Sequence, residues 1–284
     1  MKLFGNLRRL HSVRTFLAAA LAISFNASSS VAEDTYTIGI VPQFEAKKLA
    51  AIWAPVIQEI EQRADIELNM VGSPRIPDFE KSFMQGEFDF AYMNPYHSLI
   101  ALKQQGYQPL IRDGAKELYG VLVVRKDSSF QKPTDLAGRT IAFPAPNALG
   151  ASLLMRADLD TKFNVTFRSQ FVNTHASAYF NAVLGETDAA GGVMGTYMAL
   201  EPVVRDHLRI IYETTRLPPH PIVAHPRVPT EVAERVQQAI LDLAETEEGQ
   251  SLLSAIPIHK AIIPGVSDYL MLESLNLDRY YYAN

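Results

Sequence analysis

The chain has 284 residues, no cysteine and a formal net charge of −5, from 26 basic and 31 acidic side chains. The lack of cysteine excludes disulfide bonds and a lipid anchor on a thiol, and the acidic balance argues against a nucleic-acid partner. The hydrophobic content of 48% is ordinary for a globular protein, and a chain of this length can build one or two buried cores.

The first 32 residues have the pattern of a cleavable signal peptide. Four basic residues precede a short apolar run at 15–25, and Ser30-Val31-Ala32 fits a small-residue cleavage site. A membrane anchor is the weaker alternative, because the apolar run is about half of the ~20 residues that span a bilayer. Cleavage after Ala32 leaves 22 basic and 31 acidic residues, a charge of −9 on 252 residues. We therefore expect a freely diffusing protein in the periplasm.

Strands and helices alternate along the next part of the chain. The expected elements are strands at 35–41, 67–71 and 88–92 and helices at 45–62, 77–84 and 96–105. The first helix has an apolar face that predicts core packing, formed by Leu49, Trp53, Val56, Ile57 and Ile60.

A buried strand at 121–124 precedes a polar segment at 125–136 that is suited to leaving one lobe for another. The second alternating series consists of strands at 140–143, 165–172 and 188–193 and helices at 148–159 and 177–184, and a strand at 208–212 is expected to begin the return crossover. Pro218-Pro219-His220-Pro221 predicts a stiff return connection, with His220 a candidate for the rim of a cleft. The tail, helical from 228 and again at 267–277, is expected to pack on the first lobe.

This order predicts two α/β lobes with mixed, mostly parallel sheets, joined by two hinge crossovers. Lobe I is expected to combine 33–124 with 214–284, and lobe II is inserted at 125–213. Hinged lobes of this kind close around small ligands.

Polar, proline or glycine residues mark the ends of five predicted strands. The marked stretches are 41–44, 89–96, 144–147, 174–175 and 188–192. In open α/β sheets the ligand lies just outside the carboxyl ends of the strands, where backbone N–H groups of the following helices converge. We therefore expect these turns to meet at a binding site.

Several of these stretches carry a family resemblance. The residues that carry it are Val41-Pro42 with Leu49, Trp53 and Pro55; 86–96; 120–127 with Asp135-Leu136; and His175 with 182–189. In this order they resemble the periplasmic phosphate-, phosphite- and phosphonate-binding proteins of ABC transporters, the PhnD-like group of the type II periplasmic binding protein fold. The resemblance covers essentially the whole mature chain.

Proteins of that group hold a tetrahedral oxyanion by its oxygens, using neutral donors from both lobes. From the first lobe, the resemblance implies ligand contacts by Gln43, Phe44, Tyr92, Asn94 and Tyr96. From the second lobe, it implies contacts by Asn147, Ala148, Leu149, Gly150, Ser152, His175 and Ser177. Structural roles stay open for some of them: Asn94 also fits a helix cap, and Tyr92 and Tyr96 also fit the core.

The chain departs from the group at the anion-binding turn. Where its phosphonate binders have a run of hydroxyl residues, this chain has Ala148-Leu149-Gly150-Ala151, and only Ser152 supplies a hydroxyl nearby. Residues 193–196 offer no carboxylate for a substrate ammonium, which argues against an aminophosphonate. Backbone N–H groups of 148–151 can still bind an oxyanion, because small residues allow close approach. A less charged ligand is the open alternative.

The resemblance implies a monomeric solute receptor, without cofactor, that delivers its ligand to an ABC permease. A periplasmic sensor that feeds a receptor kinase is the alternative, since the binding chemistry is the same. A secreted hydrolase would need an activated nucleophile, and the sequence has no Gly-x-Ser-x-Gly or His-Glu-x-x-His motif, which leaves only the pair Ser152 and His175. The effector lobe of a transcription regulator is a third alternative. The remaining histidines show no metal-ligand spacing.

Overall fold

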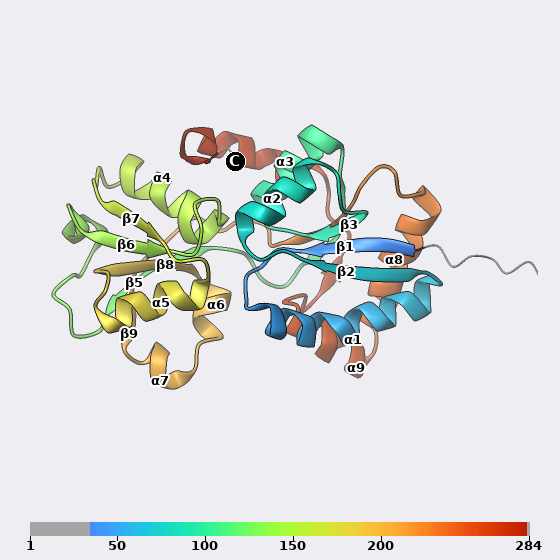
Figure 1. The fold of residues 1–284 in the computed structure, drawn as a ribbon, viewed down its shortest axis with the longest axis horizontal. Helices are drawn as coiled ribbons and strands as arrows, with labels where there is room; N and C mark the ends of the chain where they lie inside the picture. The colour runs from blue at the N-terminus through green and yellow to red at the C-terminus, as the bar shows by residue number, and fades with distance from the viewer. Residues whose placement is uncertain (1–34, 283–284) are drawn as a thin grey trace, which may run out of the picture. The chain divides into compact units, whose positions relative to one another are not determined.

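Two mixed β-sheets, each covered by helices, make up the computed structural model, which describes residues 35–282 (Figure 1). The predicted signal peptide lies outside the described residues. The first sheet has the order β11-β4-β10-β3-β1-β2. Its strands are β1 (Thr35–Ile40), β2 (Glu67–Gly72), β3 (Phe90–Tyr92), β4 (Gln108–Asp113), β10 (Pro221–Ala224) and β11 (Ala261–Ile262). The first three pair in parallel, and β10 runs antiparallel between β3 and β4.

Five helices accompany this sheet. They are α1 (Ala46–Ala64), α2 (Ile76–Met84), α3 (Pro95–Gln105), α8 (Thr230–Leu243) and α9 (Glu247–Ala255). The predicted apolar face of α1 is confirmed: its five residues are buried, and the helix packs against α8 and α9. Trp53 on this face lies 5.0 Å from the ring of Tyr92, between ring centroids, at the end of β3. The core of the first sheet therefore reaches up to its strand ends.

The second sheet has the order β7-β6-β8-β5-β9. Its strands are β5 (Gly120–Arg125), β6 (Thr140–Phe143), β7 (Arg168–Phe171), β8 (Ala189–Val193) and β9 (Leu208–Glu213). Its helical segments are η1 (Pro133–Leu136), the π-helical turn η2 (Leu149–Leu153) that continues into α4 (Leu154–Thr161), α5 (His175–Leu184), α6 (Met194–Met198) and α7 (Pro202–Arg205). Two hydrophobic clusters cover its faces, one with Met155 and Leu159 of α4 and the other with Tyr179 of α5.

The first crossing between the sheets comes earlier than the sequence predicts. The prediction that 121–124 belongs to lobe I is wrong, because β5 pairs with β8 and β9 in the second sheet. The chain therefore crosses at 114–119 and returns at 214–220. The two crossing segments are bonded to each other, since the Leu118 N–H donates to the Leu217 carbonyl at 2.9 Å and the reverse bond measures 2.8 Å. The continuous apolar run of β5 fits the centre of either sheet, so its sequence does not identify its partners.

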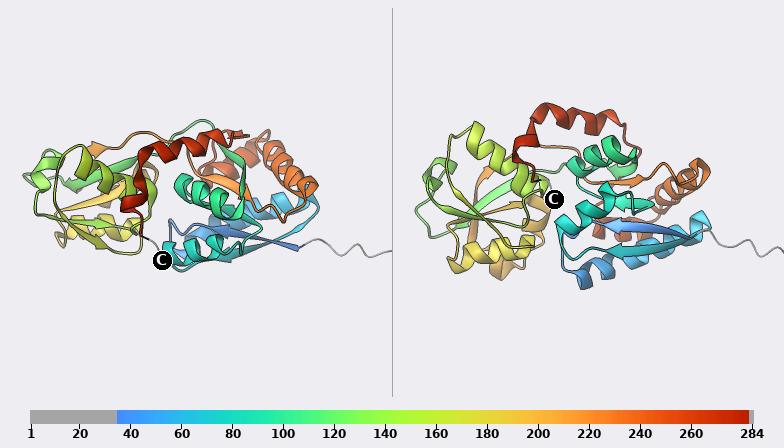
Figure 2. Two further views of the ribbon diagram at one scale, coloured as in Figure 1. Left: turned by 90° about the horizontal axis from the view of Figure 1, so that it is seen from above. Right: turned by 45° about the horizontal axis from the view of Figure 1, so that its top comes forward.

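The C-terminal segment contacts the helices of both sheets, not the first alone as predicted. It consists of α10 (Ser267–Leu270), η3 (Met271–Leu275), η4 (Leu277–Tyr280) and the residues that follow, and Figure 2 shows it running across α3 toward α4. Glu273 forms an ion pair with Lys103 of α3 at 2.8 Å, and Arg279 forms one with Asp160 of α4 at 2.9 Å. This segment is thus a third connection between the two sheets.

Gly191 and Gly192 of β8 make room for the two layers that cover the second sheet. A Cβ on Gly191 would lie 2.2 Å from the carbonyl oxygen of Ala151, and one on Gly192 would lie 1.8 Å from the Tyr179 hydroxyl. The two glycines therefore serve close packing within the second sheet itself.

The variant Gly191→Ala is expected to lower the free energy of unfolding by about 1–3 kcal/mol, because the clash is with backbone that cannot turn away. Denaturant unfolding measures the loss. Gly72→Ala is the matched control, since a Cβ there meets no atom within 4 Å. Equal stability of the two variants would contradict the packing argument.

Candidate ligand-binding site

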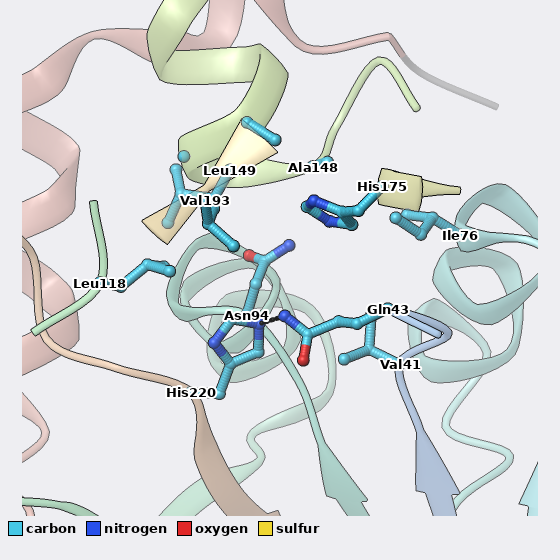
Figure 3. A pocket seen from close by; sticks show the side chains of 12 residues that line it. Val41, Gln43, Ile76, Asn94, Leu118, Ala148, Leu149, His175, Val193 and His220 are labelled. Atoms are coloured by element: carbon cyan, nitrogen blue, oxygen red, sulfur yellow. Dashed lines mark hydrogen bonds between the residues drawn. The ribbon is translucent and has the colours of Figure 1, made fainter. Parts of the chain in front are cut away.

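A small cavity lies where strand ends and helix starts of both sheets meet (Figure 3). Its lining consists of Val41, Gln43, Ile76, Asn94, Leu118, Ala148, Leu149, Gly150, Ala151, His175, Val193 and His220. The space open to the centre of a water molecule is about 20 Å³. A single water needs roughly 10–15 Å³ by that measure, so any larger ligand requires the lining residues to move apart.

Four helices begin at this cavity. Ile76 is the first residue of α2 and His175 the first of α5, while Asn94 and Ala148 are the N-cap residues of α3 and η2. The first N–H groups of a helix lack intrahelical acceptors, and the helix dipole places partial positive charge there. The cavity therefore has the electrostatic character of an anion site without any charged side chain.

Gln43 and His220 form one polar edge of the cavity. The Nε2 of Gln43 lies 3.0 Å from the Nε2 of His220, as the dashed line in Figure 3 marks. An amide NH₂ can only donate, so the Nε2 of His220 accepts in this arrangement and its proton lies on Nδ1. The His220 ring also stacks on Tyr92, with centroids 5.3 Å apart. Packing and hydrogen bonding together fix the position of both side chains.

His175 forms the opposite polar edge. Its Nδ1 lies 3.1 Å from the Thr196 hydroxyl, which lies in turn 3.0 Å from the Tyr179 hydroxyl. Both hydroxyls also reach the Val193 carbonyl, at 3.0 and 3.1 Å. When Tyr179 donates to that carbonyl, Thr196 can donate to Nδ1 and the proton of the ring lies on Nε2. This buried chain therefore allows His175 to act as a neutral donor.

Burial keeps both histidines neutral at physiological pH. Desolvation lowers the pKa of His175 to about 4. It also lowers the pKa of His220 to about 3, with smaller contributions from His97 and His175. None of the twelve lining residues, all from the described part of the chain, is an acid, a lysine or an arginine. The cavity thus offers neutral donors and apolar walls.

The structure brings six of the twelve predicted ligand residues to this cavity: Gln43, Asn94, Ala148, Leu149, Gly150 and His175. Phe44 and Tyr92 line a larger neighbouring cavity. The other four do not line the small cavity, and their side chains bond within the protein: Tyr96, Asn147, Ser152 and Ser177. Asn94 combines both of its expected roles, because it also caps α3 by accepting from the His97 N–H at 2.9 Å.

Asn147 lies at a junction between the two sheets instead of in the cavity. Its Nδ2 donates to the carboxylate of Glu80 at 3.1 Å and to the Tyr282 carbonyl at 2.8 Å, and its Oδ1 accepts from the Tyr282 N–H. Its own carbonyl accepts from Asn94 Nδ2 at 3.4 Å. The hydroxyl of Tyr96 likewise donates to Asp278 of the C-terminal segment at 2.7 Å.

His220 is the functional candidate that the sequence identified least well. It was expected only at the rim of a cleft, yet it is 8% exposed and lines the cavity. The prolines on either side of His220 were the sequence feature that indicated its position, since they fix the backbone of the return crossing.

The hydrolase pair is not assembled at the cavity, because the Ser152 hydroxyl lies outside it and accepts from Arg156 Nε at 3.2 Å. Between residues 35 and 282, no helix combines the length and apolar character needed to cross a bilayer.

Comparisons with known proteins agree with this architecture. Residues 38–269 match the family model of the ABC transporter, phosphonate, periplasmic substrate-binding protein. The phosphonates-binding periplasmic protein of Escherichia coli (strain K12) is 20% identical over 239 residues, which cover 79% of this chain and 70% of that protein.

Solved structures of similar proteins show the same fold. A binding protein component of an ABC phosphonate transporter from Pseudomonas aeruginosa has a TM-score of 0.80 at 16% identity, covering 87% of this chain and 88% of its own. PhnD1 from Prochlorococcus marinus, in complex with methylphosphonate, has a TM-score of 0.77 at 15% identity, covering 86% and 97%. The fold is that of a type II periplasmic binding protein. Because the family match spans most of its length, this chain belongs to the periplasmic substrate-binding proteins of phosphonate ABC transporters.

Proposed function

We propose that this protein binds a small phosphonate-like oxyanion in the cavity between its sheets and delivers it to an ABC permease in the inner membrane. The observation that carries the proposal is the meeting of four helix starts on a cavity without charged side chains. Phosphonate binding by similar proteins and the family match support it.

Neutral donors are sufficient for such a ligand. Helix N-termini and N–H groups stabilise an anion without a countercharge, and a hydrogen bond to a charged oxygen is about twice as strong as one between neutral groups. Because residues 148–151 carry no side-chain hydroxyl, the donors from the second sheet are the backbone N–H groups of η2. Gln43, Asn94 and His175 supply donors from side chains.

Capture and release follow from the size of the cavity. Because it holds roughly one water as it stands, the two sheets must separate at the crossings 114–119 and 214–220 to admit an oxyanion. Bound ligand then stabilises the closed arrangement, since it contacts both halves at once. The closed form is the state that a permease can distinguish from the open one.

Isothermal titration calorimetry with methylphosphonate, phosphite and phosphate tests the proposal, beside uncharged solutes such as sugars. The variant Gln43→Leu is expected to weaken oxyanion binding at least about tenfold, because it removes a donor to a charged group. Gln104→Leu is the matched control, since Gln104 is exposed on α3 and does not line the cavity.

Heat of binding from uncharged solutes alone would overturn the oxyanion assignment. Equal affinities of Gln43→Leu and Gln104→Leu for the oxyanion would remove Gln43 from the site.

A further inference from the structure

A much larger cavity opens directly beside the small one. The space open to the centre of a water molecule is about 570 Å³ there, against about 20 Å³ in the small cavity. The two cavities share four lining residues: Gln43, Leu118, Val193 and His220. These come from the ends of β1 and β8 and from the two crossing segments, so the boundary is built from both sheets.

Chain neighbours of the shared residues line the larger cavity and not the small one. Phe44 follows Gln43, Tyr119 follows Leu118, and Met194 follows Val193, while Pro219 precedes His220. At each of the four places the chain thus passes from one cavity to the other. A ligand whose oxyanion lies in the small cavity would direct any substituent on its phosphorus along these residues.

The larger cavity is lined mainly by aromatic and aliphatic side chains near this boundary, and its two acids are engaged elsewhere. The Asp113 carboxylate accepts backbone N–H groups of Ala115, Lys116, His259 and Lys260 at 2.9–3.1 Å. Glu117 lies 3.7 Å from Arg216. The lysines of the lining, Lys48 and Lys116, are exposed. The boundary therefore offers aromatic and aliphatic surface with cations, not carboxylates, over its rings: Lys48 Nζ lies 4.2 Å from the centre of the Phe44 ring and the Arg216 guanidinium 4.4 Å from that of Tyr119.

We propose that the larger cavity receives the organic substituent of the ligand, and that the preferred ligands are phosphonates with a bulky, uncharged, aromatic substituent. This inference rests on the oxyanion function proposed for the small cavity. The aromatic ring would lie against Phe44, Tyr119 and Met194, where burial of apolar surface and ring contacts stabilise it.

Calorimetry with phenylphosphonate, methylphosphonate and 2-aminoethylphosphonate tests the inference. Phenylphosphonate is expected to bind at least about tenfold more tightly than methylphosphonate, because the ring buries apolar surface that a methyl group lacks. The aminoethyl compound is expected to bind no more tightly than methylphosphonate. A variant that fills the larger cavity, Gly195→Leu, should abolish the preference for the phenyl compound and change the affinity for methylphosphonate by less than about twofold.

Gly195 suits this test because it lines the larger cavity and an added Cβ meets no atom within 4 Å. Gly72→Leu is the matched control, with equal room on β2 and no place in either cavity. Methylphosphonate binding without a preference for the phenyl compound would overturn the inference and leave the proposed function intact. A phenyl preference that survives in Gly195→Leu would also overturn the placement of the ring. If neither phosphonate binds, the proposed function fails and the inference with it.

Discussion

Replacement of Glu80 by alanine is expected to lower the free energy of unfolding by about 3–5 kcal/mol, because it leaves three hydrogen-bonding groups in the protein interior without their acceptor, each at a cost of about 1–3 kcal/mol. Glu80 on α2 is fully buried. Its Oε1 lies 2.9 Å from Nε2 of His97 and accepts from the Tyr281 hydroxyl at 3.2 Å, and its Oε2 accepts from Asn147 at 3.1 Å. The variant would leave all three groups without this acceptor.

His97 makes the loss especially costly. Its Nδ1 is buried and has no hydrogen-bond partner among the described residues, so Glu80 holds the ring through its other nitrogen. Asn147 and Tyr281 belong to the second sheet and the C-terminal segment, so the same carboxylate also joins three parts of the fold. The lost hydrogen bond of His97 and the lost connection between these three parts both destabilise the folded state.

Urea unfolding followed by tryptophan fluorescence measures the change, because Trp53 is the single tryptophan and is buried in the core. Glu87→Ala is the matched control at an exposed glutamate, and it is expected to stay within about 0.5 kcal/mol of the parent protein. A loss below about 1 kcal/mol in Glu80→Ala would contradict the structural role assigned to the carboxylate.

The alternation of strands and helices could be predicted from the sequence because most elements are long enough to show their own period. Strands β4 and β10 could not be predicted. The first contains Pro109 and charged residues, and the second has only four residues after a proline-rich stretch. Their strand character comes from pairing with each other and, for β10, with β3. Such partners are far away in the chain, and no local pattern reports them.

The residues of the candidate site likewise divide into those that the sequence could place and those whose position depends on partners far away in the chain. Gln43, Asn94 and His175 could be placed because strand ends and helix starts fix where they point. Tyr96 and Asn147 also follow strands, but the C-terminal segment supplies Asp278 and Tyr282 as their partners. The position of that segment depends on contacts with both sheets, which the sequence of the segment does not reveal. Tertiary partners thus decided which polar residues reach the cavity.

Acidification from pH 7.5 to pH 5 is expected to destabilise the protein through its two buried cavity histidines. The folded-state pKa of His175 is about 4 and that of His220 about 3, both below the ordinary value of 6.5. Between its folded-state pKa and 6.5, each of these histidines is protonated in the unfolded chain but not in the folded protein. The free energy of unfolding therefore falls as the pH drops below about 6.5, and above that pH these two groups do not change it. Each histidine therefore lowers the free energy of unfolding at pH 5 by about 2 kcal/mol relative to pH 7.5.

Variants separate this effect from the titration of carboxylates. The difference in unfolding free energy between pH 7.5 and pH 5 is expected to shrink by about 2 kcal/mol in His175→Gln and by a similar amount in His220→Gln, since glutamine does not titrate. His207→Gln, at an exposed histidine, should keep the full difference. The presence of His175 also lowers the pKa of His220, so removal of the first raises the pKa of the second toward its ordinary value. At pH 5 both folded-state pKa values lie below the pH, so this small shift changes the protonation of the folded protein very little, and the double variant should recover about the sum of the two single variants. A pH difference in the double variant as large as in the parent protein would contradict the assignment of the effect to these two rings.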